Sequence, residues 1–222
     1  MPARPGTMGL DFGLFLVFWT LMMAAMMLPS VAPVASMYLT AVRRLTTGWP
    51  LVFRVGSFVV GYLVAWAAFG IPAFGIALLG GQLAASSPRI APWVGAFLLV
   101  AAGIYQLTPL KDRCLSHCRS PLAWLFHFGN YTGPLRDMRA GLFHGGYCVG
   151  CCWGLMLVLI AVGVMNLAWM VGLAVVVFLE KTWRYGKALR IAIGFAFLGL
   201  ALLVPWHPEL LPGFYMSRGM GM

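Results

Sequence analysis

The chain of 222 residues is 62% hydrophobic and only 9% charged, and its formal net charge is +10. A soluble domain of this length does not need so large an apolar fraction to bury its core, so the composition excludes a soluble globular protein. It predicts one integral membrane domain over residues 1–222 with an all-α fold, a polytopic transmembrane helical bundle. Anionic lipid accounts for basic segments beside a membrane, so no nucleic acid partner is expected.

Six apolar windows predict the membrane spans, at 11–40, 55–80, 90–109, 140–165, 166–180 and 187–205. Each approaches the ~20 residues that a helix needs to cross the hydrocarbon, and the fifth window is the shortest. The apolar run 12–28 is longer than the core of a usual signal peptide, and no small-x-small cleavage site follows it. We therefore expect a first span there rather than a cleaved signal.

Basic residues predict the orientation, because they are retained in the cytoplasm when they flank a span. Most of the fifteen Lys and Arg residues fall in the first, third and fifth loops: Arg43, Arg44 and Arg54; Lys111, Arg113, Arg119, Arg136 and Arg139; Lys181, Arg184, Lys187 and Arg190. This distribution predicts a multi-pass membrane protein with the odd-numbered loops in the cytoplasm and both termini outside.

The third loop, 110–139, is the longest polar interruption, and it contains an apolar patch of Trp124, Leu125, Phe126 and Phe128. Aromatic residues favour the membrane–water interface. The patch predicts a short interfacial helix that starts at Pro121 and ends at Gly129 and Asn130.

The segment HGGYCVGCCWG, at the start of the fourth window, contains His144, Cys148, Cys151 and Cys152. On a helix the three cysteines lie at roughly +40°, −20° and +80° from His144, so all four side chains share one face. This spacing of soft and borderline ligands predicts a metal site near the cytoplasmic side of the membrane. The alternative is that the cysteines are small buried apolar residues.

A second cluster, Cys114, His117 and Cys118, follows the third window in KDRCLSHC. Both clusters fall on the predicted cytoplasmic side, where they can meet. One tetrahedral ion needs fewer ligands than the two clusters offer, so we expect the second cluster to provide an entry site or a second site.

Methionines form a repeated doublet in the first window, LMMAAMMLPS. Met22 and Met26 lie about 40° apart on a helix, where they would form a soft lining or an onward step for the metal. A methionine stripe also serves as flexible packing. Thioether beside thiolate selects Cu(I) over harder ions, so copper is the expected metal, ahead of zinc or iron.

Two charges, Glu180 and Lys181, close the fifth window. They either pair with each other at a helix end or provide a polar contact to the metal cluster, since an unpaired charge is costly in the membrane. The sequence shows no nucleotide loop, no Ser-His-Asp arrangement and no paired catalytic carboxylates. A protein that is not an enzyme by itself is therefore favoured.

Two alternatives to metal handling remain. Cys148 and Cys151 form a C-x-x-C pair, which is typical of a thiol–disulfide or quinone-linked oxidoreductase. The recurrent glycines of the predicted spans suit close helix packing, as in a structural subunit of a membrane complex.

Four segments occur in a specific order: WTLMMAAMMLPS, YQLTPLKDRCLSHCRSP, GLFHGGYCVGCCWGLM, and MNLAWM followed by FLEK. Together they resemble a bacterial domain-of-unknown-function family of predicted metal-binding integral membrane proteins, sometimes labelled copper chaperones. The resemblance covers nearly the whole chain. It implies the membrane fold and a bound metal. Together with the Cys, His and Met residues, it predicts a protein of the bacterial inner (plasma) membrane that binds copper and passes it to a membrane enzyme, or serves as a metal-bearing accessory subunit. The expected partners are the lipid bilayer and a membrane protein or a second copy of the chain.

Overall fold

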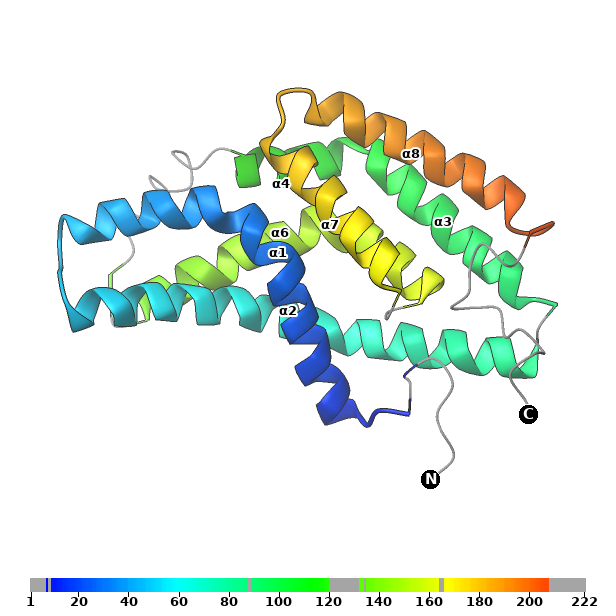
Figure 1. Ribbon diagram of the computed structural model, residues 1–222, viewed down its shortest axis with the longest axis horizontal. Helices are drawn as coiled ribbons and strands as arrows, with labels where there is room; N and C mark the ends of the chain where they lie inside the picture. The colour runs from blue at the N-terminus through cyan, green and yellow to red at the C-terminus, as the bar shows by residue number, and fades with distance from the viewer. Residues whose placement is uncertain are drawn as a thin grey trace.

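The computed structural model describes residues 7, 9–87, 89–119, 132–133, 135–163 and 166–207. Within these ranges the protein is entirely helical and contains no strand (Figure 1). The helices are α1 (Phe12–Arg43), α2 (Trp49–Ser86), α3 (Ala91–Leu107), α4 (Pro109–Arg119), α6 (Arg136–Val162), α7 (Leu167–Thr182) and α8 (Gly186–Leu203). The all-α prediction is confirmed.

Helix α6 forms the centre of the structure. Its residues from Gly154 to Val162 are all buried, and α2, α3, α4 and α7 pack around it. A helix that is apolar on every side is removed from water, either by lipid or by other helices, and these residues of α6 are covered by other helices. The cysteines of this helix therefore lie inside the protein.

Glycines allow α2 and α6 to pack backbone to backbone. A Cβ atom on Gly141 would lie 1.9 Å from the carbonyl oxygen of Phe58, and one on Gly61 would lie 2.1 Å from that of Met138. Small residues at such positions are the usual means by which membrane helices approach closely. The close approach determines which α2 side chains reach the cysteines of α6.

Prolines shape the two bends next to the core. Pro29 and Pro33 lie inside α1, and Figure 1 shows that helix bending partway along its length. Pro109 begins α4 after Thr108, whose extended backbone is the conformation favoured before proline. As a result α4 turns by 62° from the axis of α3 and runs against α6.

The predicted windows coincide with α1, α2, α3, α6, α7 and α8, but the helices are not equally long. In the described part of the chain, four helices are long and apolar enough to cross a membrane, or five if α3 and α4 form one bent span. Helix α7 has only 16 residues, which is about 24 Å of helix. The count of six spans is therefore not confirmed. The predicted interfacial helix lies in 120–131, outside the described residues.

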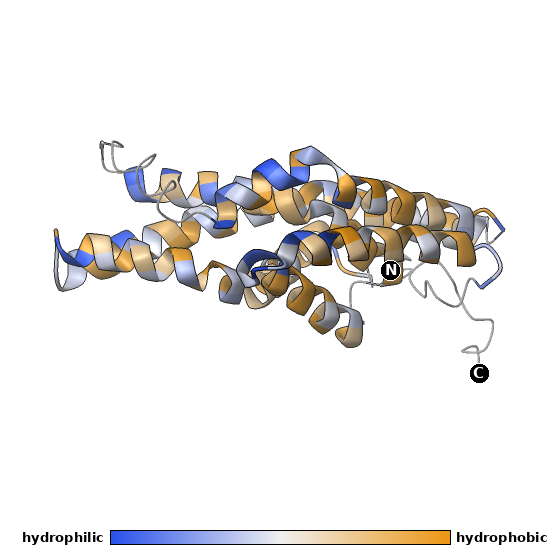
Figure 2. Cartoon of the chain, turned by 90° about the horizontal axis from the view of Figure 1, so that it is seen from above, coloured by the Kyte–Doolittle hydropathy of each residue, from blue (hydrophilic) through white to orange (hydrophobic). Residues whose placement is uncertain are grey.

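Hydrophilic residues gather at the helix ends and connections, while the helices other than α4 are mainly apolar along their lengths (Figure 2). One such polar group joins three helices near the start of α6. Tyr38 of α1 donates a hydrogen bond of 2.5 Å to the carboxylate of Asp137, which also pairs with the Arg54 guanidinium at 3.0 Å. This group holds the first turn of α6 against α1 and α2.

Candidate metal centre

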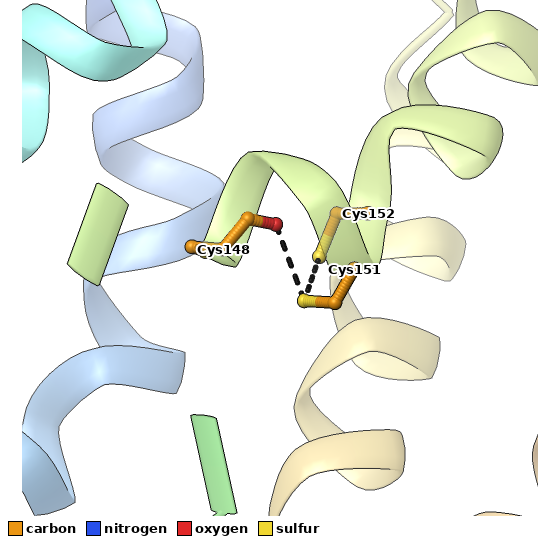
Figure 3. Close-up of side chains that lie close together, drawn as sticks. All are labelled: Cys148, Cys151 and Cys152. Carbon is orange, nitrogen blue, oxygen red and sulfur yellow. Dashed lines mark hydrogen bonds between the residues drawn. The ribbon is translucent and has the colours of Figure 1, made fainter. Parts of the chain in front are cut away.

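Three cysteine sulfurs from a single helix lie together at the core of the protein. The Sγ atoms of Cys148, Cys151 and Cys152 all lie within 4.8 Å of one another, and each residue is buried. Figure 3 shows the sulfurs of Cys151 and Cys152 close together and the carbonyl oxygen of Cys148 facing the Cys151 sulfur. The sulfurs of Cys151 and Cys152 are 3.2 Å apart, and the Cys151 thiol also contacts the Cys148 carbonyl oxygen at 3.2 Å. We refer to these three residues as the cysteine triad.

The triad follows from the period of the helix. Residues three and four positions apart lie one turn away on the same face, so Cys148 meets both Cys151 and Cys152. Because α6 begins at Arg136, Cys148 lies about 18 Å along the helix. The triad is thus near the middle of α6.

Cys148 has polar partners from other helices. The Lys181 ammonium of α7 lies 2.9 Å from the Cys148 sulfur and donates a second hydrogen bond, of 3.1 Å, to the Ser30 hydroxyl of α1. The Tyr62 hydroxyl of α2 is 3.1 Å from the same sulfur. A buried cation beside a thiol favours the thiolate, which is the form that binds metals. Cys148 therefore lies in a polar environment inside an apolar core.

Two further cysteines approach the triad from α4. The Cys118 sulfur is buried and lies 4.0 Å from the Cys151 sulfur. Cys114, one turn earlier, is half-buried and faces Gly150, where a Cβ would be only 3.3 Å from its sulfur. The prediction that the two cysteine clusters meet is confirmed, because the bend between α3 and α4 places α4 against the middle of α6.

The two predicted histidine ligands are not part of the triad. His144 is buried one turn before Cys148, with its ring 6.1 Å from that of Tyr62 and 6.3 Å from that of Phe58. His117 stacks on Tyr147 with ring centroids 3.9 Å apart. The role of both histidines as metal ligands stays a prediction.

The methionines of α1 are mostly buried. Met23, Met26 and Met27 are in the core, whereas Met22 is only half-buried against it. Met26 lies one turn before Ser30, which shares the Lys181 ammonium with Cys148. The soft lining predicted for Met22 and Met26 stays a prediction. Because Met26 is buried and Met22 is only half-buried, Met26 is the better placed of the two to contribute to it.

Glu180 and Lys181 contact different partners. The Glu180 carboxylate accepts hydrogen bonds from the Lys111 ammonium at 2.7 Å and from the Gln106 amide at 2.9 Å, and all three side chains are buried. Lys181 points to Cys148 instead. Of the two predicted roles of this pair, contact with the cysteine cluster is the one observed, and Glu180 instead secures the junction of α3 and α4.

The contacts of Ser30 and Tyr62 with this site were not predicted from the sequence. Both residues lie in long apolar helices, where a hydroxyl is an ordinary occurrence, so no local pattern distinguishes them. Lys181 did carry a signal, because a charge next to an apolar run is costly unless it is paired.

The spacing of the sulfurs suits a single ion. Metal–thiolate bonds of about 2.3 Å place sulfurs roughly 4 Å apart on a shared metal. The contacts of Cys151 with Cys152, at 3.2 Å, and with Cys118, at 4.0 Å, bracket this value. Small side-chain rotations would therefore allow the triad, alone or with Cys118, to hold one thiophilic metal ion.

Comparison with known proteins gives one family and no individual relative. No curated protein and no solved structure matches the chain. A model of the PpoB2 family, described as copper chaperones, matches residues 16–204. This range includes every residue of the cysteine triad, both cysteines of α4 and the polar partners of Cys148. The chain belongs to the PpoB2 copper chaperone family.

Proposed function

We propose that the protein binds Cu(I) at the cysteine triad within the membrane and passes the ion to a membrane enzyme, either as a separate chaperone or as a metal-bearing accessory subunit. The observation that carries the proposal is the buried group of Cys148, Cys151 and Cys152, whose sulfurs lie within 4.8 Å of one another. In this proposal copper is the ion that the protein transfers, and not a cofactor of the protein.

Ligand chemistry supports copper. Thiolate sulfur is a soft ligand that selects Cu(I), zinc or iron–sulfur clusters over hard ions such as magnesium. Structural zinc sites almost always use four ligands in a tetrahedron, whereas the triad provides three and Cys118 touches it only through Cys151. The description of the family as copper chaperones agrees with this choice.

Electrostatics supports the binding of a cation at this depth. A cluster of thiolates without a counter-charge would be very costly in an apolar core. The Lys181 ammonium, 2.9 Å from the Cys148 sulfur, offsets part of that charge before the metal arrives. Cu(I) can then replace the thiol protons of the triad while the remaining charge stays inside the protein, away from lipid.

The membrane setting supports transfer rather than storage in solution. Within the ranges that the structure describes, four helices are long and apolar enough to span a membrane, and the triad is buried inside the protein. The basic loops favour an orientation in the bacterial inner membrane with the termini outside and α4 near the cytoplasmic face. An acceptor for copper held at this depth would itself be a membrane protein or a second copy of this chain.

Metal analysis of the purified protein tests the proposal. The wild type, loaded with Cu(I) without oxygen and freed of excess ion, should retain near-stoichiometric copper. The triple variant Cys148→Ser, Cys151→Ser, Cys152→Ser should retain none, while Cys114→Ser, a half-buried cysteine outside the triad, should retain the wild-type amount. Full copper retention by the folded triple variant would reject the site, and a strong preference for zinc would reject Cu(I).

Thiol trapping distinguishes copper transfer from the function of a dithiol oxidoreductase. An enzyme that used Cys148 and Cys151 as an exchanging dithiol would form a mixed disulfide with its substrate, which thiol trapping in cells would detect. Copper transfer requires no such species. We therefore expect the trapped wild type to yield only free thiols.

A further inference from the structure

A cavity lies between α4 and α6, next to Cys114. Its volume is about 450 Å³, and its lining residues are Cys114, Leu142, Phe143, Gly146 and Tyr147. Of the five cysteines, Cys114 alone is half-buried, while the other four are buried. Among the described residues that line the cavity, Cys114 is the one with a thiol.

Cys114 continues into a line of sulfurs that leads inward. Cys118 follows one turn later on the same helix, so both side chains project to the same side of α4. The Cys118 sulfur lies 4.0 Å from that of Cys151, which in turn lies 3.2 Å from that of Cys152. The absence of a side chain at Gly150 lets the Cys114 sulfur approach α6 next to Cys151.

The line is held in place by contacts that do not involve the sulfurs. Lys111 pairs with Glu180 at 2.7 Å in the first turn of α4, and Asp112 pairs with Arg190 at 3.0 Å. The Arg119 guanidinium at the other end of α4 donates to the carbonyl oxygen of Trp183. Both ends of α4 are thus tied to α7, α8 and the turn between them, which keeps Cys118 against Cys151.

We propose that Cys114 and Cys118 form an exchange relay that carries Cu(I) between the cavity and the cysteine triad. The relay rests on the proposed function, since its cargo is the same ion. Cys114 is the docking thiol at the cavity, and Cys118 is the intermediate ligand. The triad is the resident site at the inner end.

Each step is a ligand exchange without redox chemistry. Copper remains Cu(I) while one copper–sulfur bond forms and another breaks, and the proton released by the incoming thiol passes to the thiolate that leaves. The ion remains bound to at least one sulfur throughout. Consequently the relay changes the rate at which copper enters and leaves, and it leaves the amount held at equilibrium unchanged.

Loading kinetics test the relay. Purified protein in detergent micelles is mixed, without oxygen, with Cu(I) supplied as its glutathione complex, and copper–thiolate absorption is followed in the ultraviolet. We expect Cys114→Ser and Cys118→Ser to load at least tenfold more slowly than the wild type and to reach the same final copper content. Wild-type rates in both variants would overturn the relay. Loss of copper from Cys118→Ser at equilibrium would make Cys118 a resident ligand and overturn its role as an intermediate.

A second pair of variants tests the cavity without removing any thiol. Gly146 lines the cavity, and a Cβ added there would meet no atom within 4 Å, so Gly146→Leu should fill the space without disturbing α6. Gly172 on α7 is an equally open helical glycine away from the cavity, and Gly172→Leu is the matched control. We expect slow loading only in Gly146→Leu. Equal rates in the two variants would reject the cavity as the entrance.

The outcomes separate the relay from the proposed function. If the wild type retains no copper at equilibrium, the proposed function fails and the relay fails with it. If the wild type retains copper but Cys114→Ser and Gly146→Leu load at its rate, only the relay fails.

Discussion

The Lys181 ammonium lies 2.9 Å from the sulfur of Cys148, although the two residues belong to different helices, and both side chains are buried. A cation and a thiol at this distance form a charge-assisted pair when the thiol is ionised. The pair gives one of the three cysteines in the triad a polar environment, while the other two pack among sulfur and apolar groups. Its removal should therefore affect copper binding more than the loss of a surface charge would.

Lys181→Met should weaken Cu(I) binding. The substitution keeps most of the length of the side chain but removes its charge. Cys148 must lose its thiol proton to bind Cu(I), and without the charge-assisted hydrogen bond that step costs about 1.5–3 kcal/mol more. This corresponds to a roughly 10- to 100-fold lower affinity. Competition with a Cu(I) chelator of known affinity measures the change. Lys181→Arg retains the charge and should lose less, and equal affinities for both variants and the wild type would contradict the role of the cation.

Tyr62→Phe should lower the stability of the protein slightly. The variant retains the aromatic ring in the core and removes only the hydroxyl that lies 3.1 Å from the Cys148 sulfur. We expect a loss of about 1 kcal/mol in the free energy of unfolding, measured in mixed micelles, because that is the usual net value of one hydrogen bond. Tyr185→Phe, at an exposed tyrosine between α7 and α8, should be neutral. A neutral Tyr62→Phe would show that the contact contributes nothing to stability.

Gly141→Ala should disrupt the packing of α2 against α6. The added Cβ would lie 1.9 Å from the carbonyl oxygen of Phe58, so the helices must move apart. Overpacking of this kind costs about 1–3 kcal/mol or more. Size-exclusion chromatography after heating in detergent should show a lower unfolding temperature than for Gly56→Ala, where a Cβ meets nothing within 4 Å. Equal thermal stability of the two variants would contradict the close α2–α6 contact.

Glu180→Leu should destabilise the protein by about 3–5 kcal/mol, because it leaves the buried ammonium of Lys111 without its carboxylate partner. The double variant Lys111→Met, Glu180→Leu removes both charges and should recover most of that stability. Unfolding in SDS-containing mixed micelles measures both. If the double variant is no more stable than Glu180→Leu alone, the two side chains are not coupled in the way that their distance of 2.7 Å indicates.

Much of the fold could be predicted from the apolar windows, because hydrophobic length is a local property of the chain. The helical class and the approximate places of six helices follow from it. The helix α4 (Pro109–Arg119) was not predicted, because its sequence is polar and its stability comes from the pairing of Lys111 with Glu180 and of Asp112 with Arg190. Partners so distant in the sequence leave no local pattern.

The central part of the candidate site, the cysteine triad, could be predicted from the sequence. Cys148, Cys151 and Cys152 meet because of helix periodicity alone, so their spacing was sufficient. His144 lies one turn before Cys148, with its ring near those of Tyr62 and Phe58, because the direction of a side chain depends on the neighbouring helix as well as on spacing. The expected ligand roles of His117 and Met22 stay predictions.

The sequence by itself determined that this is an apolar helical protein with a cysteine cluster on one face of one helix, because composition and helical period act within a single segment. Only the tertiary structure decided what surrounds that cluster. The glycine contacts of α2 with α6 bring Tyr62 to Cys148, the end of α7 brings Lys181, and the bend before α4 brings Cys118 to Cys151. These contacts depend on the packing of helices that are far apart in the chain, and packing is decided by shape and charge in three dimensions.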